Sequence, residues 1–306
     1  MKNSMSAALA WGGVLLAGAL WGVGAIVAEL LMERGMSPQS LALARFGLGL
    51  PLLWAWHLWQ ARAVAGGTAA SLPWGRLGWR DRAFMLCTGA ATALAVTSWF
   101  AGIAILGAGL PTLIAICFAP VIVALVSVLR GYERLTARKL VALGLALAGV
   151  VAMVWPAGRM VLPQGYAAGI AWSFLSAAAQ AMVVLGNARM PREVSPASAS
   201  AWGMTAAACC MAVVALPQGV TPPVGAWGWL GLAYTGVVTT SVAYLLFAWG
   251  ARRLTPTAAI VGIMVEPLVA VVLASLLLAE PMVARQWAGA GLLVLAVWLL
   301  MRPAKS

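Results

Sequence analysis

Charged residues are scarce in this chain of 306 residues: only 8% are Asp, Glu, Lys or Arg, against about 25% in ordinary soluble domains. A soluble protein of this length needs a charged surface to face water. With 63% hydrophobic residues and a mean hydropathy of +0.97, the chain lacks the residues for such a surface. The composition excludes a soluble enzyme, a disordered protein and a disulfide scaffold, and it leaves a membrane protein with many spans.

Motifs for nucleotide hydrolysis, metal binding and hydrolytic catalysis are missing as well. The sequence contains no G-x-x-x-x-G-K-[ST], no HExxH and only one histidine. The four cysteines lie within apolar runs, and the adjacent Cys209 and Cys210 are poor disulfide partners. We therefore expect no cofactor, no metal site and no enzymatic activity. The alternative to a protein without enzymatic activity is an intramembrane lipid-modifying enzyme.

Long apolar runs fill most of the chain. Each is close to the roughly 20 residues that a membrane-spanning helix needs. Their continuity differs from the alternating pattern of membrane β-barrels, so we expect an all-α membrane protein with ten transmembrane helices. The predicted spans are 9–31, 38–59, 83–106, 109–129, 136–155, 165–187, 196–216, 226–249, 256–279 and 285–302.

The net charge of +12 comes mainly from arginines between these runs. In a soluble protein this charge would suggest a nucleic-acid partner, but here it fits the positive-inside rule of membrane proteins. If the N-terminus is cytoplasmic, fifteen Lys and Arg face the cytoplasm and three face outward, namely Arg34, Arg159 and Arg285. We therefore expect both termini in the cytoplasm, the lipid bilayer as a partner and no nucleic acid.

An internal repeat divides the chain into residues 1–155 and 156–306. A shift of 147 residues places Pro120 on Pro267 and Glu133 on Glu280, and it also places Arg138 on Arg285 and Gly144 on Gly291. Coincidence of the rare Glu and Arg is hard to obtain by chance in this composition. Five is an odd number of spans, so the two five-helix halves are predicted to be inverted repeats, a common plan of secondary transporters.

Several sequence pieces resemble the drug/metabolite transporter superfamily in its EamA-type branch. They are Leu20-Trp21-Gly22, Ala44-Arg45-Phe46, Pro120 followed by 131–136 (GYERLT), and Val265-Glu266-Pro267 followed by Glu280. The chain is most similar to the aromatic amino-acid exporters, the YddG-like group. The resemblance implies an exporter of small metabolites in the bacterial inner membrane, with a central cavity lined by the first, third, fourth, sixth, eighth and ninth runs. The sequence departs from the family at Ala279, where Gly is frequent.

Two ionisable residues inside predicted spans are candidates for binding a substrate. A charge at the bilayer centre is costly and usually functional. Glu266 stands on a stripe of small residues, so we expect it to bind a substrate ammonium or to carry a coupling proton; a fixed structural pair is the alternative. Arg45 fits a substrate carboxylate, and the alternative is an ion pair with Glu29 or with Glu266.

Further candidates are aromatic and polar side chains deep in the spans. For an apolar or aromatic side chain of the substrate we expect Trp21, Trp99, Trp172 and Tyr244, with Gln180 as a polar neighbour. Packing or lipid contact is the alternative for each aromatic residue. Tryptophans near the run ends, Trp11 and Trp227 among them, fit an interfacial belt.

Pro120 and Pro267 are predicted hinges, because proline removes a helix hydrogen bond and permits a kink. We expect a secondary transporter that exports aromatic and other neutral amino acids, or related small metabolites, by alternating access. Substrate would leave down its gradient or in exchange for protons. The alternatives within transport are a nucleotide-sugar or a cationic-drug substrate. The sequence leaves open whether the protein is a monomer or a homo-oligomer.

Overall fold

A computed structural model describes residues 2–65, 74–106, 109–155, 164–191, 193–277 and 282–301. Arg159 and Glu280, used above in the charge pattern and the repeat, lie outside these ranges, as does Ala279. The described residues form helices and connections without any strand. The helices are α1 (Lys2–Glu33), α2 (Pro38–Ala65), η1 (Trp74–Arg76), α3 (Trp79–Leu106), α4 (Gly109–Leu129), α5 (Ala137–Val154), α6 (Tyr166–Ala188), α7 (Pro196–Ala215), η2 (Leu216–Gln218), α8 (Gly225–Tyr234), η3 (Thr235–Val242), α9 (Ala243–Ala251), α10 (Pro256–Ile263), α11 (Val265–Leu277) and α12 (Ala284–Met301).

The prediction of ten spans is confirmed, since ten helices in the described residues are long and apolar enough to cross a membrane. Two of the ten are irregular. In the eighth span, the π-helical segment η3 separates α8 from α9. In the ninth span, the α-helix is interrupted at Met264, between α10 and α11.

Several helix ends follow from local sequence. Thr136, Ser195 and Thr255 accept a hydrogen bond from the backbone N–H three residues later, and so cap α5, α7 and α10. Proline follows directly after Ser195 and Thr255, at the helix position where its missing N–H costs nothing. After α4, Gly131 has φ +65°, a conformation that favours glycine.

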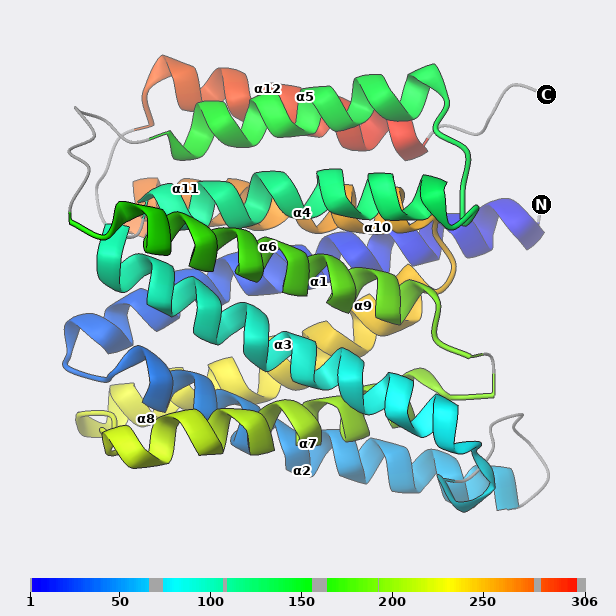
Figure 1. The fold of residues 1–306 in the computed structure, drawn as a ribbon, viewed down its shortest axis with the longest axis vertical. Helices are drawn as coiled ribbons and strands as arrows, with labels where there is room; N and C mark the ends of the chain where they lie inside the picture. Colours follow the sequence, from blue (N-terminus) through cyan, green and yellow to red (C-terminus); the bar gives the residue numbers. More distant parts are fainter. Residues whose placement is uncertain are drawn as a thin grey trace.

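The main helix pairs all join the first half of the chain to the second. In Figure 1, α5 and α12 lie side by side along one edge of the molecule, and α1 passes through its middle. α3 packs against α6 and α7, while α1 packs against α9 and α11. Gly149 of α5 and Gly289 of α12 face each other so closely that an added Cβ on Gly149 would lie 2.7 Å from the Gly289 carbonyl oxygen. Small residues at such crossings let membrane helices approach.

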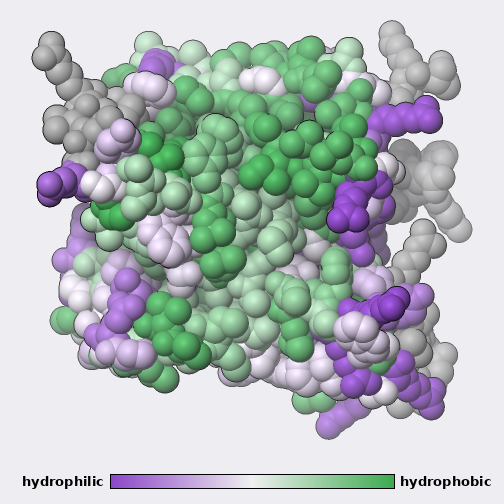
Figure 2. Space-filling model, viewed as in Figure 1, coloured by the Kyte–Doolittle hydropathy of each residue, from purple (hydrophilic) through white to green (hydrophobic). Residues whose placement is uncertain are grey.

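Most arginines of the described residues lie at one end of the molecule. α1 begins and α12 ends at the same end in Figure 1, which we call the arginine-rich end. Because successive spans alternate in direction, this end also carries the connections with Arg76, Arg80, Arg130, Arg134 and Arg252. Figure 2 shows hydrophobic residues over the middle of the visible face and hydrophilic residues toward the two ends of the helices.

Most tryptophans expected at the membrane interface are exposed near helix ends. Trp79 of α3 is 73% exposed, and Trp227 of α8 is 75% exposed. Trp11 is an exception and the prediction for it was wrong, because it is 4% exposed and packs in the core between α4, α5 and α10. Its position near a span end in the sequence did not show which side of α1 it occupies.

Candidate functional site

A cavity of about 310 Å³ lies between the two halves of the chain. Its wall comes from α1, α2, α3 and α4 of the first half, and from α6, η3, α9, α10 and α11 of the second. These are the runs that the family resemblance implied, with the addition of α2. A space lined by both halves can change its access when the halves move relative to one another.

Six of the seven candidate binding residues line this cavity and are partly exposed. They are Trp21, Arg45, Trp99, Gln180, Tyr244 and Glu266. The structure places Trp172 elsewhere: its side chain is 42% exposed on α6 and is not part of the cavity wall. Pro267 lies on the wall, whereas Pro120 lies within the continuous helix α4.

Glu266 lies at the interruption of the ninth span. Pro267 has no N–H, and its ring would clash with the carbonyl of Ile263 in a regular α-helix, so α10 ends at Ile263 and α11 begins at Val265. Glu266 therefore stands in the first turn of α11, where the helix dipole favours a negative charge. Interrupted membrane helices of this kind commonly form substrate sites in transporters.

α1 runs directly against this interruption. A Cβ added to Gly22 would lie 2.6 Å from the backbone oxygen of Glu266, and one added to Gly18 would lie 3.1 Å from that of Ile263. The Leu-Trp-Gly sequence at 20–22 therefore has a structural reason: Gly22 admits the backbone of the ninth span, and Trp21 beside it reaches the cavity.

Arg45 of α2 supplies a positive charge to the same cavity. Its Nε atom lies 3.4 Å from the Thr240 hydroxyl oxygen, and its guanidinium carbon lies 5.6 Å from the centre of the Phe46 ring. Its charge interacts with that of Glu266 and with Tyr244. Glu29 is exposed and does not belong to the wall. The Arg45–Glu29 and Arg45–Glu266 pairs both stay predictions, although Arg45 and Glu266 line the same cavity.

The indole donors of the cavity tryptophans are used within the protein. Trp21 Nε1 donates to the Thr239 carbonyl oxygen at 2.8 Å, and Trp99 Nε1 donates to the Thr112 hydroxyl at 3.0 Å. The Tyr244 ring meets Trp21 edge to face, with ring centres 5.0 Å apart. Because their indole N–H groups are already bonded, Trp21 and Trp99 offer apolar ring surface to a ligand.

The hydroxyl side chains of α6 behave in two ways. Ser173 donates to Gly169 in its own helix, the usual arrangement in a membrane helix. Ser176 on the cavity wall instead donates to the Ala95 carbonyl of α3, at 2.8 Å. Ser176 thus links α6 to α3 rather than bonding to its own helix. Its neighbour Gln180, one turn away, faces the cavity.

In the first half of the chain, the cavity wall lies away from the arginine-rich end. On α1 its wall uses residues 21–32 near the end of that helix, and on α2 it uses residues 41–45 near the beginning. On α3 the wall residues lie between 95 and 100, and on α4 between 112 and 119. These positions lie toward the opposite end, whereas wall residues of the second half, such as Val183, Tyr244 and Ile260, lie toward the arginine-rich end. The cavity therefore occupies the middle of the molecule.

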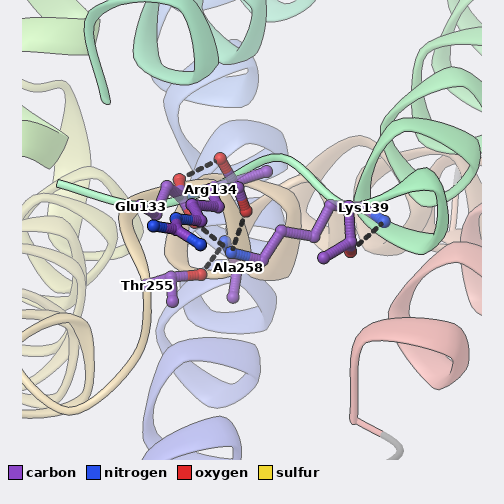
Figure 3. Close-up of polar contacts among 7 residues, drawn as sticks. Glu133, Arg134, Lys139, Thr255 and Ala258 are labelled. Carbon is purple, nitrogen blue, oxygen red and sulfur yellow. Dashed lines mark hydrogen bonds and ion pairs between the residues drawn. The ribbon is translucent and has the colours of Figure 1, made fainter. Parts of the chain in front are cut away.

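The arginine-rich end is held together by Glu133, in the connection between α4 and α5. Its carboxylate accepts hydrogen bonds from the backbone N–H of Thr257, at 3.0 Å, and from the Thr257 hydroxyl. Lys139 Nζ lies 2.7 Å from the other carboxylate oxygen, and the Glu133 side chain is 2% exposed. Figure 3 shows Glu133 and Lys139 beside the start of α10, where the Thr255 hydroxyl accepts a hydrogen bond from the backbone N–H of Ala258.

This contact joins the first half of the chain to the second. Burial raises the pKa of Glu133, but the hydrogen bonds from Lys139 and Thr257 outweigh burial and hold the pKa below its ordinary value. One further contact joins the halves nearby. The Arg189 guanidinium carbon lies 3.8 Å from the centre of the Tyr132 ring. This cation–π contact and the Glu133 contact both connect the two halves at the arginine-rich end.

Glu133 stood out in the sequence through the internal repeat, and neither Thr112 nor Thr257 stood out. Each of these threonines contacts a partner on another helix or far away in the sequence. No spacing in the sequence signals such a contact.

Comparisons with known proteins agree with this architecture. The sequence model of the EamA-like transporter family matches residues 8–155 and 167–302. The uncharacterized transporter sll0355 of Synechocystis sp. is 26% identical over 131 residues, which are 42% of this chain and 40% of that relative. A solved structure described only as "Crystal structure of protein" covers 97% of this chain and 98% of its own, with a TM-score of 0.75 and 18% identity, and supports the fold alone.

Proposed function

Because the chain belongs to the EamA-like transporter family and is a membrane transporter, we propose that it exports aromatic and other neutral amino acids, or closely related small metabolites, as a secondary transporter. The observation that carries this proposal is the presence of both Arg45 and Glu266 on an otherwise largely apolar, aromatic wall. An amino-acid zwitterion presents one carboxylate for the guanidinium and one ammonium for the carboxylate. Its side chain then lies against Trp21, Trp99 and Tyr244.

The size of the cavity supports a small substrate. Its 310 Å³ is near the lower limit of ligand pockets, which range from about 300 to 1,000 Å³. A nucleotide sugar is larger, and its phosphates need several cations, whereas Arg45 is the one Lys or Arg on the described wall. A cationic drug would be attracted by Glu266 but repelled by Arg45. Amino acids satisfy both charges.

Alternating access is the mechanism that we propose for this cavity. The positive-inside rule assigns the arginine-rich end to the cytoplasm, with both termini there. The two halves, as inverted repeats, would rock about the cavity. In this proposal the Glu133 contact closes the cavity toward the cytoplasm. Opening for a cytoplasmic substrate requires the bonds from Thr257 to Glu133 to break.

The first test is exchange of labelled tryptophan, threonine and methionine in proteoliposomes, with and without an inward proton gradient. Wild-type protein is compared with Glu266→Gln and with the matched control Glu33→Gln, which makes the same change at an exposed position outside the cavity. Saturable exchange supports amino-acid transport. Loss of only the gradient dependence in Glu266→Gln assigns proton coupling to Glu266, and loss of all exchange assigns substrate binding.

Absence of exchange of all three amino acids, by protein with a cooperative thermal transition, contradicts the proposed substrate class. Nucleotide sugars and cationic drugs are then the next substrates to test. Equal effects of the substitutions at Glu266 and at Glu33 contradict the proposed site.

A further inference from the structure

The π-helical segment η3 frees a backbone acceptor at the cavity. In an α-helix the N–H of Ala243 would bond to the carbonyl of Thr239, four residues earlier. Here it bonds to the Val238 carbonyl, five residues earlier. The Thr239 carbonyl oxygen instead accepts the indole N–H of Trp21 from α1. The π register of the eighth span thus orients an aromatic wall residue of another helix.

Thr240, the next residue of η3, contacts Arg45, the cation on the cavity wall. The Thr240 hydroxyl donates to the Thr235 carbonyl at 3.0 Å, so its oxygen is left to accept from Arg45 Nε at 3.4 Å. One position further, the Ser241 hydroxyl donates to the Gly49 carbonyl of α2 at 2.7 Å. Gly49 lies one turn after Arg45. The Thr240 hydroxyl therefore contacts the Arg45 side chain, and the Ser241 hydroxyl contacts the backbone of the same helix, α2.

Close packing fixes η3 against both helices. A Cβ on Gly24 of α1 would lie 2.6 Å from Thr239 Cγ2, and one on Gly49 of α2 would lie 2.8 Å from Thr240 Cγ2. From the other direction, a Cβ on Gly236 would lie 2.6 Å from Leu48 Cβ. These contacts have no room for a methyl group, so a small change of η3 moves α1 and α2 together.

We propose that η3 is the positioning element of the cavity, and that Thr240 and the Thr239 backbone determine specificity by holding Arg45 and Trp21 in one fixed arrangement. This rests on the proposed function: the arrangement selects substrates with a carboxylate next to an apolar side chain. A return of η3 to α-helical register would bond Ala243 to Thr239 and release Trp21. π-helical turns are frequent at functional sites for this kind of reason.

The test compares Thr240→Val, which keeps the shape but removes the hydroxyl, with Thr240→Ser, which keeps the hydroxyl. We expect Thr240→Val to raise KM for tryptophan exchange about tenfold with little change in kcat, because a hydrogen bond to a charged group is lost. Thr240→Ser should stay near the wild type. Trp21→Phe should lower the preference for tryptophan over threonine.

The matched control is Thr205→Val. Thr205 accepts the indole N–H of Trp54 at 3.1 Å, a similar bond between α2 and α7 outside the cavity wall. Its loss should leave KM and the preference unchanged. If Thr240→Val and Thr240→Ser both exchange like the wild type, the positioning role is overturned while the proposed function stands.

A second readout needs no substrate. Thermal unfolding of the purified protein is measured for Arg45→Gln, Thr240→Val and the double variant. If Thr240 holds Arg45, the double variant loses less thermal stability than the sum of the two single losses. Additive losses overturn the positioning of Arg45 even if the wild type exchanges no amino acid, an outcome that by itself contradicts only the proposed function.

Discussion

Two glutamates, Glu133 and Glu266, lie in contrasting surroundings. Glu133 is satisfied: Lys139 and both donors of Thr257 contact its carboxylate. Among the described residues, no hydrogen-bond donor contacts the carboxylate of Glu266, which borders the cavity at a helix interruption. A buried charge is costly without partners. The contrast indicates that Glu133 holds the two halves together, whereas Glu266 is left for something that enters the cavity.

The largest effect is expected from removing the charge that faces Glu266. Arg45→Gln should lower kcat/KM for amino-acid exchange about a hundredfold, because the carboxylate of the bound substrate would lose its charged partner in the cavity. Arg34→Gln makes the same change at an exposed position and should have no effect. Exchange rates in proteoliposomes over a range of substrate concentrations measure kcat/KM for the two variants and the wild type. Similar kinetics for both variants would remove Arg45 from the site.

The next effect concerns the satisfied glutamate. Glu133→Ala leaves Lys139 without its carboxylate partner and the backbone N–H of Thr257 without its acceptor. We therefore expect the state closed at the arginine-rich end to lose about 2 kcal/mol of stability. The variant should melt at lower temperature and change the exchange rate rather than KM. Thr257→Ser keeps the hydroxyl and serves as the mild comparison. A KM change equal to that of the Arg45 variant would mean that the two regions are not distinct.

The two prolines related by the repeat should differ. Pro267→Ala restores a backbone donor where the ninth span is interrupted, while α4 is already continuous through Pro120. We therefore expect Pro267→Ala to slow exchange severalfold, Pro120→Ala to have a smaller effect, and the double variant to resemble Pro267→Ala. Unaltered transport by a well-folded double variant would exclude both residues as hinges.

The smallest effect is the response of the closed end to pH. The pKa of Glu133 is lowered in the folded protein, so its contribution to stability is full above the unfolded pKa of about 4.3 and is lost as pH falls through the folded pKa. Between pH 5 and 8 this contribution should stay constant. Thermal unfolding from pH 3 to 8, with Glu133→Gln as control, measures this, and a transition near pH 6 that the control lacks would contradict it.

Much of the cavity could be predicted because charge and deep aromatic residues are rare inside membrane spans. Arg45 and Glu266 stand out for that reason, and both lie on the wall. Trp172 shows the limit of the argument: it occupies a place in the sixth run similar to that of Trp21 in the first, yet its side chain is exposed. Position along a helix sets depth, but the packing of neighbouring helices decides which side faces the cavity.

Run length and composition were sufficient for the ten helices, because lipid leaves the backbone no partner except its own helix. Tertiary structure alone decided the rest. It placed Glu133 against Thr257, 124 positions apart in the chain, and it brought Trp21 and Arg45 onto η3. These contacts depend on how tightly glycine-lined helices approach and on which backbone carbonyls an irregular helix leaves free. Both are properties of several helices packed together, and no single run of the sequence contains them.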